Sequence, residues 1–251
     1  MTGPERLRRN DGERDDLTAT KSISIACLAL LASVQAGAAP RPDTVAKAWQ
    51  LSFKFNHPEP IAVPDVDGAL RWYWFMSYKV VNNTDKDRHF LPKITVASEQ
   101  GDIVEANKGI SPRVFKVVKA TVRNQLLVDP VAVAGLLRVG QDQAKESVAI
   151  WRAFDHDVDN LFVFISGLSG EVAKVINPKT GEPVIDPESL KPVIDPRTSK
   201  PVLDPKTNGP LVEPRPLLLR KTRMIEYHFP GTSVHPQHQT FVMKSKQWVM
   251  R

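Results

Sequence analysis

The sequence predicts a mainly β protein: an antiparallel sandwich with one or two short helices and a proline-rich nonapeptide-repeat insertion. In the segment Arg71 to Val81 (RWYWFMSYKVV) every second side chain is large and apolar, which is typical of a strand packed on a core. Turn residues rather than long helices separate the predicted strands, and this favours an antiparallel sandwich over a parallel α/β sheet. From Val175 to Pro210 one nine-residue phrase recurs.

Residues 1–39 are predicted to be a leader and a signal peptide, followed by one domain at 40–251. The apolar run Ser22 to Val34 (SISIACLALLASV) follows Lys21 and precedes a small-residue cleavage site near Ala38, as in export signals. Its 13 residues fall short of the about 20 needed to cross a bilayer. We therefore expect a secreted or periplasmic bacterial protein with a cleaved signal peptide and no transmembrane anchor in its mature form.

Cys27, the only cysteine, lies inside that apolar run, and Ser24-Ile25-Ala26 before it lacks the leucine of a lipid-attachment signal. Lipid anchoring is therefore not expected. The mature chain would contain no cysteine, so it would fold without disulfides and rely on its hydrophobic core.

The chain carries a formal net charge of +6, and the excess belongs to the mature part because residues 1–39 hold equal numbers of basic and acidic side chains. Such a charge either forms solvated faces or weakly attracts anionic polymers. No nucleic-acid-binding signature is present, so nucleic acid is not an expected partner. Two candidate basic patches are Arg113, Lys116, Lys119 and Arg123, and Arg220, Lys221 and Arg223.

The first predicted strand is Trp49 to Phe55, and it ends at the proline-rich break HPEPIAVP, residues 57–64. After the strand at 71–81, Asn82 to Asp87 is a predicted turn, because its short polar side chains can bond to their own backbone. Phe90 to Ala97 (FLPKITVA) is then predicted to be the returning strand.

The segment Tyr78 to Val96 (YKVVNNTDKDRHFLPKITV) contains a valine, paired asparagines, a small polar turn and then an apolar strand. In this pattern it resembles the hairpins of bacterial exported immunoglobulin-like modules. The resemblance covers only this segment and implies an immunoglobulin-like sandwich. Such modules share no common activity, so the resemblance implies no function. Asn82 to Thr84 also matches a glycosylation signal, which we interpret as incidental.

Ser111-Pro112 predicts the start of a helix, and valines at helical spacing after it predict the buried face of that helix. Asp129-Pro130 repeats the start signal and predicts a shorter helix through Leu137, closed by Gly140. A strand at Leu161 to Ile165 (LFVFI) is apolar on both faces, which predicts a central position. Further strands are predicted at Ser147 to Phe154, Leu217 to Phe229 and Thr240 to Met250.

The repeat has the pattern Val-[Ile/Leu]-[Asp/Asn]-Pro-x-[Thr/Ser]-x-x-Pro. An Asp or Asn before proline favours a type I or Asx turn, so each unit offers one polar turn and a short apolar extended step. Because strands are predicted on both sides of it, residues 175–216 form an arm inserted in one domain. The units are 175–183, 184–192, 193–201 and 202–210.

Three interpretations of this arm remain open. It can be a flexible or semi-rigid spacer, or a stack of turns that docks its Val-Ile pairs on a neighbouring surface. The third is a calcium-binding solenoid that uses Asp186, Asp195 and Asp204, although the paired glycines of such repeats are missing. From its placement between two predicted strands, we expect a projecting arm that contacts a partner or spans a distance.

No catalytic, cofactor-binding or metal-binding residue is assigned from the sequence. Gly167 to Glu171 (GLSGE) nearly matches the nucleophile elbow G-x-S-x-G, but the last glycine is missing and no helix can follow, so a plain turn is predicted. His228, His235 and His238 can offer imidazoles to a metal, as can Asp155-His156-Asp157, but we interpret them as hydrated surface side chains.

We therefore expect a non-enzymatic envelope or extracellular interaction or structural protein without a cofactor, whose repeat arm is a spacer or a partner contact. The expected partner is a protein or an envelope polymer. One alternative is a metal-dependent hydrolase of the envelope that uses the histidines named above. The other is a module that binds carbohydrate or an anionic polymer, for which Tyr73 and Phe75 are the candidate stacking residues.

Overall fold

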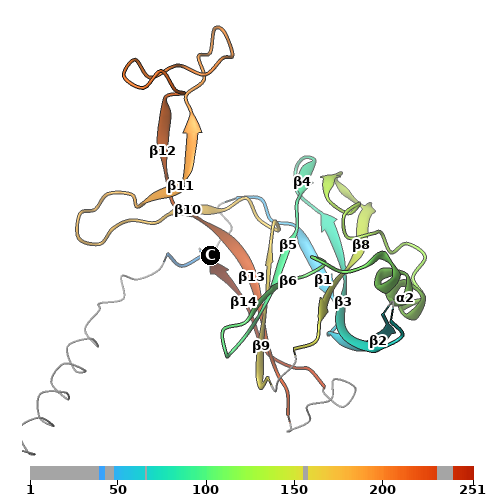
Figure 1. Cartoon of the computed structure of the whole chain (residues 1–251). Helices are drawn as coiled ribbons and strands as arrows, with labels where there is room; N and C mark the ends of the chain where they lie inside the picture. The colour runs from blue at the N-terminus through green and yellow to red at the C-terminus, as the bar shows by residue number, and fades with distance from the viewer. Residues whose placement is uncertain (1–39, 43–47, 66, 155–157, 231–239) are drawn as a thin grey trace, which may run out of the picture. The chain divides into compact units, whose positions relative to one another are not determined.

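The computed structural model describes residues 40–42, 48–65, 67–154, 158–230 and 240–251 (Figure 1). The predicted leader and signal peptide therefore lie outside the described residues. All described residues belong to one compact unit, Ala39–Arg251. The fold of this unit is mainly β, and its paired strands are antiparallel, as the sequence predicts.

A four-stranded sheet is built around the long strand β3. One side of β3 pairs with β8, and the other side pairs first with β2 and then with β1. The bounds of these strands are β1 Ser52–Phe55, β2 Glu59–Pro64, β3 Leu70–Asn82 and β8 Gly140–Arg152.

A six-stranded sheet has β9 in its interior, between β5 and β13, as predicted for the LFVFI segment. Its strands are β5 Lys93–Ser98, β6 Ile103–Glu105, β9 Asn160–Ser166, β10 Val172–Lys174, β13 Leu218–His228 and β14 Val242–Met250. Two smaller pairs complete the strands of the described chain: β4 Arg88–Phe90 with β7 Gly135–Leu137, and β11 Ile185–Pro192 with β12 Val212–Pro216.

The main core draws side chains from both larger sheets, an arrangement consistent with a β-sandwich. Trp74 and Met76 of β3 lie in the same buried cluster as Val163 of β9 and Ile225 of β13. The face of β3 that the sequence predicts to be buried is the face that enters this core. A strand with a large apolar side chain at every second position can bury that face continuously.

Helix α2 (Pro112–Val122) packs on the opposite face of the four-stranded sheet. Its start matches the prediction, with Ser111 at the N-cap and Pro112 in the first turn. Val114 and Val118 of the helix meet Phe75 of β3 in a second buried cluster. Both faces of the four-stranded sheet are therefore covered.

Two predicted elements are wrong. The proline-rich stretch at 57–64 contains strand β2, not only a break; β2 pairs with β3 alone, and an edge strand tolerates proline because its outward side needs no N–H donor. The segment Asp129 to Leu137 is not a helix. A turn at Asp129 leads directly into β7, and Gly135 adopts a φ of +119°, which a helix does not allow.

The predicted return of the chain at Phe90 to Ala97 is also wrong, because β3 and β5 do not pair. Strand β5 belongs to the other sheet, so the chain crosses between sheets after the turn at 82–87. The turn itself is formed as predicted: Asn82 Oδ1 accepts the Thr84 N–H at 3.0 Å. Asn82, the acceptor residue of the glycosylation signal, is fully buried and donates to the carbonyl of Leu137.

The repeat segment leaves the six-stranded sheet after β10 and returns to it at β13, and these two strands pair with each other (Figure 1). A closed ring of three backbone hydrogen bonds marks this exit. Val184 donates to Val175, Leu217 to Val184 and Val175 to Leu217, at 2.8, 2.7 and 3.0 Å. We call this ring the basal junction.

An equivalent ring, the distal junction, lies beyond the hairpin formed by β11 and β12. Here Val202 donates to Val193, Leu211 to Val202 and Val193 to Leu211, at 2.8, 2.7 and 2.8 Å. The first, third and fourth repeat units are loops closed at these rings, and the second unit forms β11 (Figure 1). The described residues of the arm thus form a branched hairpin with looped units.

The turn chemistry of the three looped units is the predicted one. The third residue of each unit accepts the N–H two residues later, at 2.8 to 2.9 Å. The seventh residue has a left-handed backbone in each loop: Gly181, Ser199 and Asn208, with φ of 72°, 54° and 56°. The second unit has Leu190 at this position, and a bulky residue disfavours that conformation. This local difference agrees with the extended form of the second unit, which its pairing with β12 completes.

Candidate functional site

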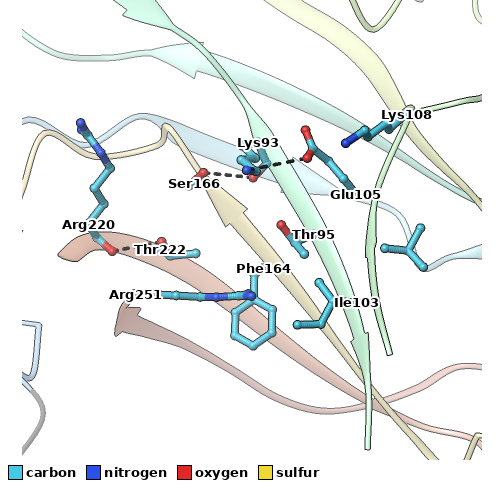
Figure 2. A pocket seen from close by; sticks show the side chains of 11 residues that line it. Lys93, Thr95, Ile103, Glu105, Lys108, Phe164, Ser166, Arg220, Thr222 and Arg251 are labelled. Atoms are coloured by element: carbon cyan, nitrogen blue, oxygen red, sulfur yellow. Dashed lines mark hydrogen bonds and ion pairs between the residues drawn. The ribbon is translucent and has the colours of Figure 1, made fainter. Parts of the chain in front are cut away.

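A basic pocket lies on the outer face of the six-stranded sheet, turned away from the core. It has a volume of about 630 Å³ and is open to solvent. Strands β5, β6, β9 and β13 supply most of its lining (Figure 2). Its charged residues are four cations, Lys93, Lys108, Arg220 and Arg251, and one acid, Glu105.

Strand alternation decides which side chains reach the pocket. Ile94 of β5 is buried in the core, so its neighbours Lys93 and Thr95 lie on the outer face. The antiparallel register places Lys93 opposite Ser166 and Thr95 opposite Phe164 on β9. Residues far apart in the sequence are thereby brought to one surface.

The positive charge of the pocket is only partly neutralised. The Lys93 Nζ lies 3.7 Å from the Glu105 carboxylate, and the amine of Lys108 points toward the same carboxylate (Figure 2). Glu105 is the one acidic residue among the described residues that line the pocket. Arg220 and Arg251 therefore add charge that this carboxylate does not balance.

An aromatic ring and the hydroxyl groups of Thr95, Ser166 and Thr222 also line the pocket. The guanidinium carbon of Arg251 lies 4.2 Å from the ring centroid of Phe164, a cation–π contact (Figure 2). Ser166 Oγ donates to the carbonyl of Lys93 at 3.1 Å, and Thr222 Oγ1 donates to that of Arg220 at 3.0 Å. The Ser166 hydroxyl oxygen keeps lone pairs that can accept a hydrogen bond from a ligand, whereas Thr222 is buried.

The predicted patch at 220–223 does not form one surface. Arg220 lines the pocket, whereas Lys221 is buried in an ion pair with Glu171. Arg223 lies on the core side of β13, 4.9 Å from the ring of Trp248, and burial lowers its pKa. Alternation along a strand separates consecutive residues, so basic neighbours in the sequence are not neighbours on the surface.

The predicted patch on the helix does form one surface. Arg113, Lys116 and Arg123 are exposed, and the partly buried Lys119 donates to the carbonyl of Leu127 at 2.8 Å. A helix places residues three and four apart on the same side, so this sequence pattern holds in the structure.

The prediction that Tyr73 and Phe75 could form a stacking surface is wrong. Phe75 is only 3% exposed, and Tyr73 packs partly buried against the same cluster. Helix α2 covers this face of β3, which the sequence pattern of β3 alone does not reveal. The aromatic ring that does reach a pocket is Phe164.

The turn at Gly167 to Glu171 is a structural turn, as predicted. Ser169 Oγ donates to the carbonyl of Trp49 at 3.2 Å, and Gly170 N–H donates to the same carbonyl at 3.1 Å. Gly167 has a φ of +85°. Ser169 therefore anchors the start of the domain rather than facing a base.

The histidine candidates are not brought together in the described structure. His228 Nδ1 lies 2.9 Å from the carbonyl of Asp159. His235, His238 and Asp155-His156-Asp157 fall outside the described residues. Within the described ranges no group of three His, Cys, Asp or Glu residues could hold a metal ion. Asp195 and Asp204 each use a carboxylate oxygen in their own turns.

The pocket residues Lys93, Lys108, Phe164 and Arg251 were not singled out by the sequence. Each belongs to a different segment, and only sheet pairing unites them.

None of the helices in the described part of the chain is long and apolar enough to cross a membrane. Comparison of the chain with protein-family models, with curated proteins and with solved structures finds no match.

Proposed function

We propose that this chain is a non-enzymatic envelope or extracellular protein that binds an anionic polymer at the basic pocket on its six-stranded sheet. One observation carries the proposal: four basic side chains line the pocket together with the ring of Phe164, and Glu105 is the one acidic residue among the described residues of the lining. The four are Lys93, Lys108, Arg220 and Arg251. Guanidinium and ammonium groups bind carboxylate, sulfate or phosphate oxygens.

The form of the pocket favours a polymer over a small metabolite. Small-molecule sites enclose most of their ligand, whereas this pocket is a depression on the outside of a sheet and open to solvent. Phe164 offers an apolar face on which a sugar ring can stack, and Ser166 offers a hydroxyl acceptor. These features together suit an anionic polysaccharide.

In this proposal the protein reaches its ligand by export, with residues 1–39 as leader and cleaved signal peptide. The domain is an immunoglobulin-like sandwich, and the repeat segment 175–216 is an insertion that serves as a spacer or partner contact. The exposed second residue of each unit supports a contact role, with 46 to 56% of its surface free: Ile176, Ile185, Ile194 and Leu203.

The test is affinity chromatography of the full chain on immobilised polygalacturonate, a linear polymer with carboxylates, eluted with a salt gradient. The variant Arg220→Glu/Arg251→Glu should elute at clearly lower salt, because charge attraction to the polymer is screened by salt and reversed by the substitution. The matched control Arg197→Glu/Lys200→Glu makes the same charge change on exposed residues of the arm.

Equal elution of the pocket variant and the arm control would show that net charge alone causes retention, and the pocket would lose its role. Phe164→Ala separates stacking from charge. It should weaken binding to polygalacturonate while leaving retention on a simple sulfonate cation exchanger unchanged. If the protein is retained on immobilised neutral dextran as strongly as on polygalacturonate, the proposal is also contradicted.

A further inference from the structure

A second cationic surface lies on helix α2. Its four basic residues recur at intervals of three and four positions, so they occupy one side of the helix and span about 15 Å along it. The helix itself, PRVFKVVKATV, contains no acidic residue. Three of its basic side chains line a hollow of about 430 Å³ at the C-terminal end: Lys116, Lys119 and Arg123.

The carboxylate that lies next to this region is already matched by another cation. Glu146 of β8 forms an ion pair with Lys79 at 3.0 Å and accepts a hydrogen bond from Asn124. These hydrogen bonds, that of Lys79 first, hold the pKa of Glu146 below its usual value. Glu146 therefore stays charged and is matched by Lys79, so it does not neutralise the exposed helix cations Arg113, Lys116 and Arg123.

The two basic surfaces face opposite directions. Helix α2 packs on the outer face of the four-stranded sheet through Val114 and Val118, and the main core lies on the inner face of that sheet. The pocket lies on the outer face of the six-stranded sheet, beyond the core. Since packed layers are about 10 Å apart, at least two layer spacings separate the surfaces.

We propose that the exposed side of helix α2 is a second site for the same anionic polysaccharide, so that one molecule bridges two polymer strands. This inference rests on the proposed function of the pocket. A ligand strand on the pocket cannot also lie on the helix side without passing around the sandwich. Two sites on opposite faces instead hold two strands, and a polymer that offers many groups gains avidity from both.

The test mixes the full chain with long polygalacturonate and records light scattering as the protein-to-polymer ratio is raised. Bridging should give scattering that peaks at an intermediate ratio and falls when polymer is in excess, because each protein molecule then binds a single strand. Short oligogalacturonates should bind without scattering. Light scattering of the protein alone establishes that it is monomeric under the same conditions.

The decisive variant is Arg113→Glu/Lys116→Glu on the helix. Both side chains are exposed, and Arg113 lies in the first turn, where the helix dipole favours glutamate, so we expect little loss of stability. This variant should still be retained on the polygalacturonate column through the pocket, but the scattering peak at intermediate ratio should be lost, because a protein with one site cannot join two polymer strands.

Scattering of the helix variant equal to that of the arm control Arg197→Glu/Lys200→Glu would overturn the inference and leave the proposed function intact. Loss of all column retention in the pocket variant would also overturn it, since a second site must leave residual binding. Scattering that arises from self-association of the protein would also count against the inference. Binding of the helix side to anionic vesicles but not to polygalacturonate would do the same. The inference stands if the pocket variant and the helix variant are each still retained on the polygalacturonate column and neither gives the scattering peak.

Discussion

Lys221 donates a hydrogen bond from Nζ to Glu171 Oε2 at 2.7 Å, and the two side chains are only 2% and 9% exposed. The backbone N–H of Lys221 also donates to the carbonyl of Glu171 at 3.0 Å. Glu171 precedes the repeat arm and Lys221 follows it. The buried pair therefore fastens both ends of the 175–216 segment to the six-stranded sheet.

Replacing Glu171 with Gln is expected to lower the free energy of unfolding by about 3 kcal/mol or more, because the buried Lys221 then faces a neutral amide in place of a carboxylate. Urea denaturation followed by tryptophan fluorescence measures the change. The paired apolar replacement Glu171→Leu/Lys221→Met should cost much less, since no buried charge remains. If the double variant is as unstable as the single one, packing rather than charge explains the effect.

Gly167 is expected to tolerate no side chain. Its φ is +85°, and a Cβ placed there would lie 2.4 Å from the carbonyl oxygen of Leu91, which is a backbone atom. Gly167→Ala should therefore destabilise the fold by about 2 kcal/mol or more, from strain and the clash together. Gly68→Ala is the matched control, because its φ is +82° with no atom within 4 Å. If the two variants lose the same free energy of unfolding, backbone strain alone explains the effect and the clash with Leu91 contributes nothing.

Stability at alkaline pH is expected to depend on Tyr78, whose burial raises its pKa to about 12 while a hydrogen bond with Ser147 opposes this. The unfolded pKa is about 10. Because the folded pKa is the higher one, the stabilisation is complete below pH 10 and is lost as pH rises through 12, by about 2 to 3 kcal/mol at most.

Unfolding by urea at pH 9 to 12 measures this dependence. Tyr78→Phe cannot ionise and should lose less stability than the native chain between pH 10 and 12. Burial also raises the pKa of Tyr227, so Tyr227→Phe should remove a further part of the loss. If the free energy of unfolding falls with pH equally steeply in the native chain and in Tyr78→Phe between pH 10 and 12, Tyr78 does not cause the loss.

The two junction rings of the arm are expected to protect their amides from hydrogen exchange. Val184 and Leu217 in the basal junction, and Val202 and Leu211 in the distal junction, donate N–H groups at 2.7 to 2.8 Å. Their exchange should be slowed, while amides of the loop tips, which make no ring, exchange faster. Exchange of all arm amides within seconds would instead make the segment a mobile spacer.

The left-handed position in the loops provides a sharper test. Asn208 has a φ of 56° and is exposed, so its replacement changes backbone preference more than packing. Asn208→Val should weaken protection at Leu211 by about tenfold or more, since a β-branched residue in this conformation costs about 1 to 2 kcal/mol. Asn208→Gly should preserve the protection. Equal protection in the two variants would contradict the role assigned to this position.

Local patterns were enough to predict several elements. The alternation from Trp72 to Val80 identified the buried face of β3, and Ser111-Pro112 with its spaced valines identified helix α2. The Asx turns of the repeat were also predicted, because an Asp or Asn side chain bonds to its own backbone two residues on. Each of these features depends on neighbours within about one or two turns of chain.

The candidate site was predicted only in part. The helix patch was found because helical periodicity is local, but the pocket unites Lys93, Phe164 and Arg251 through strand pairing. Tyr73 and Phe75 were assigned to a free surface, and helix α2 covers them. No pattern within β3 records that a distant helix packs on it.

The sequence alone established a β-rich domain, the turn chemistry of the repeat and the positive charge of the chain, because strand alternation, proline and Asx geometry and ionisation are properties of short segments. Tertiary structure decided that β3 and β5 lie in different sheets, that the second repeat unit becomes β11, and that Lys221 is buried while Arg220 faces solvent. These outcomes depend on which strands pair across long stretches of chain, and the free energy of such pairing comes from burying faces contributed by many segments at once.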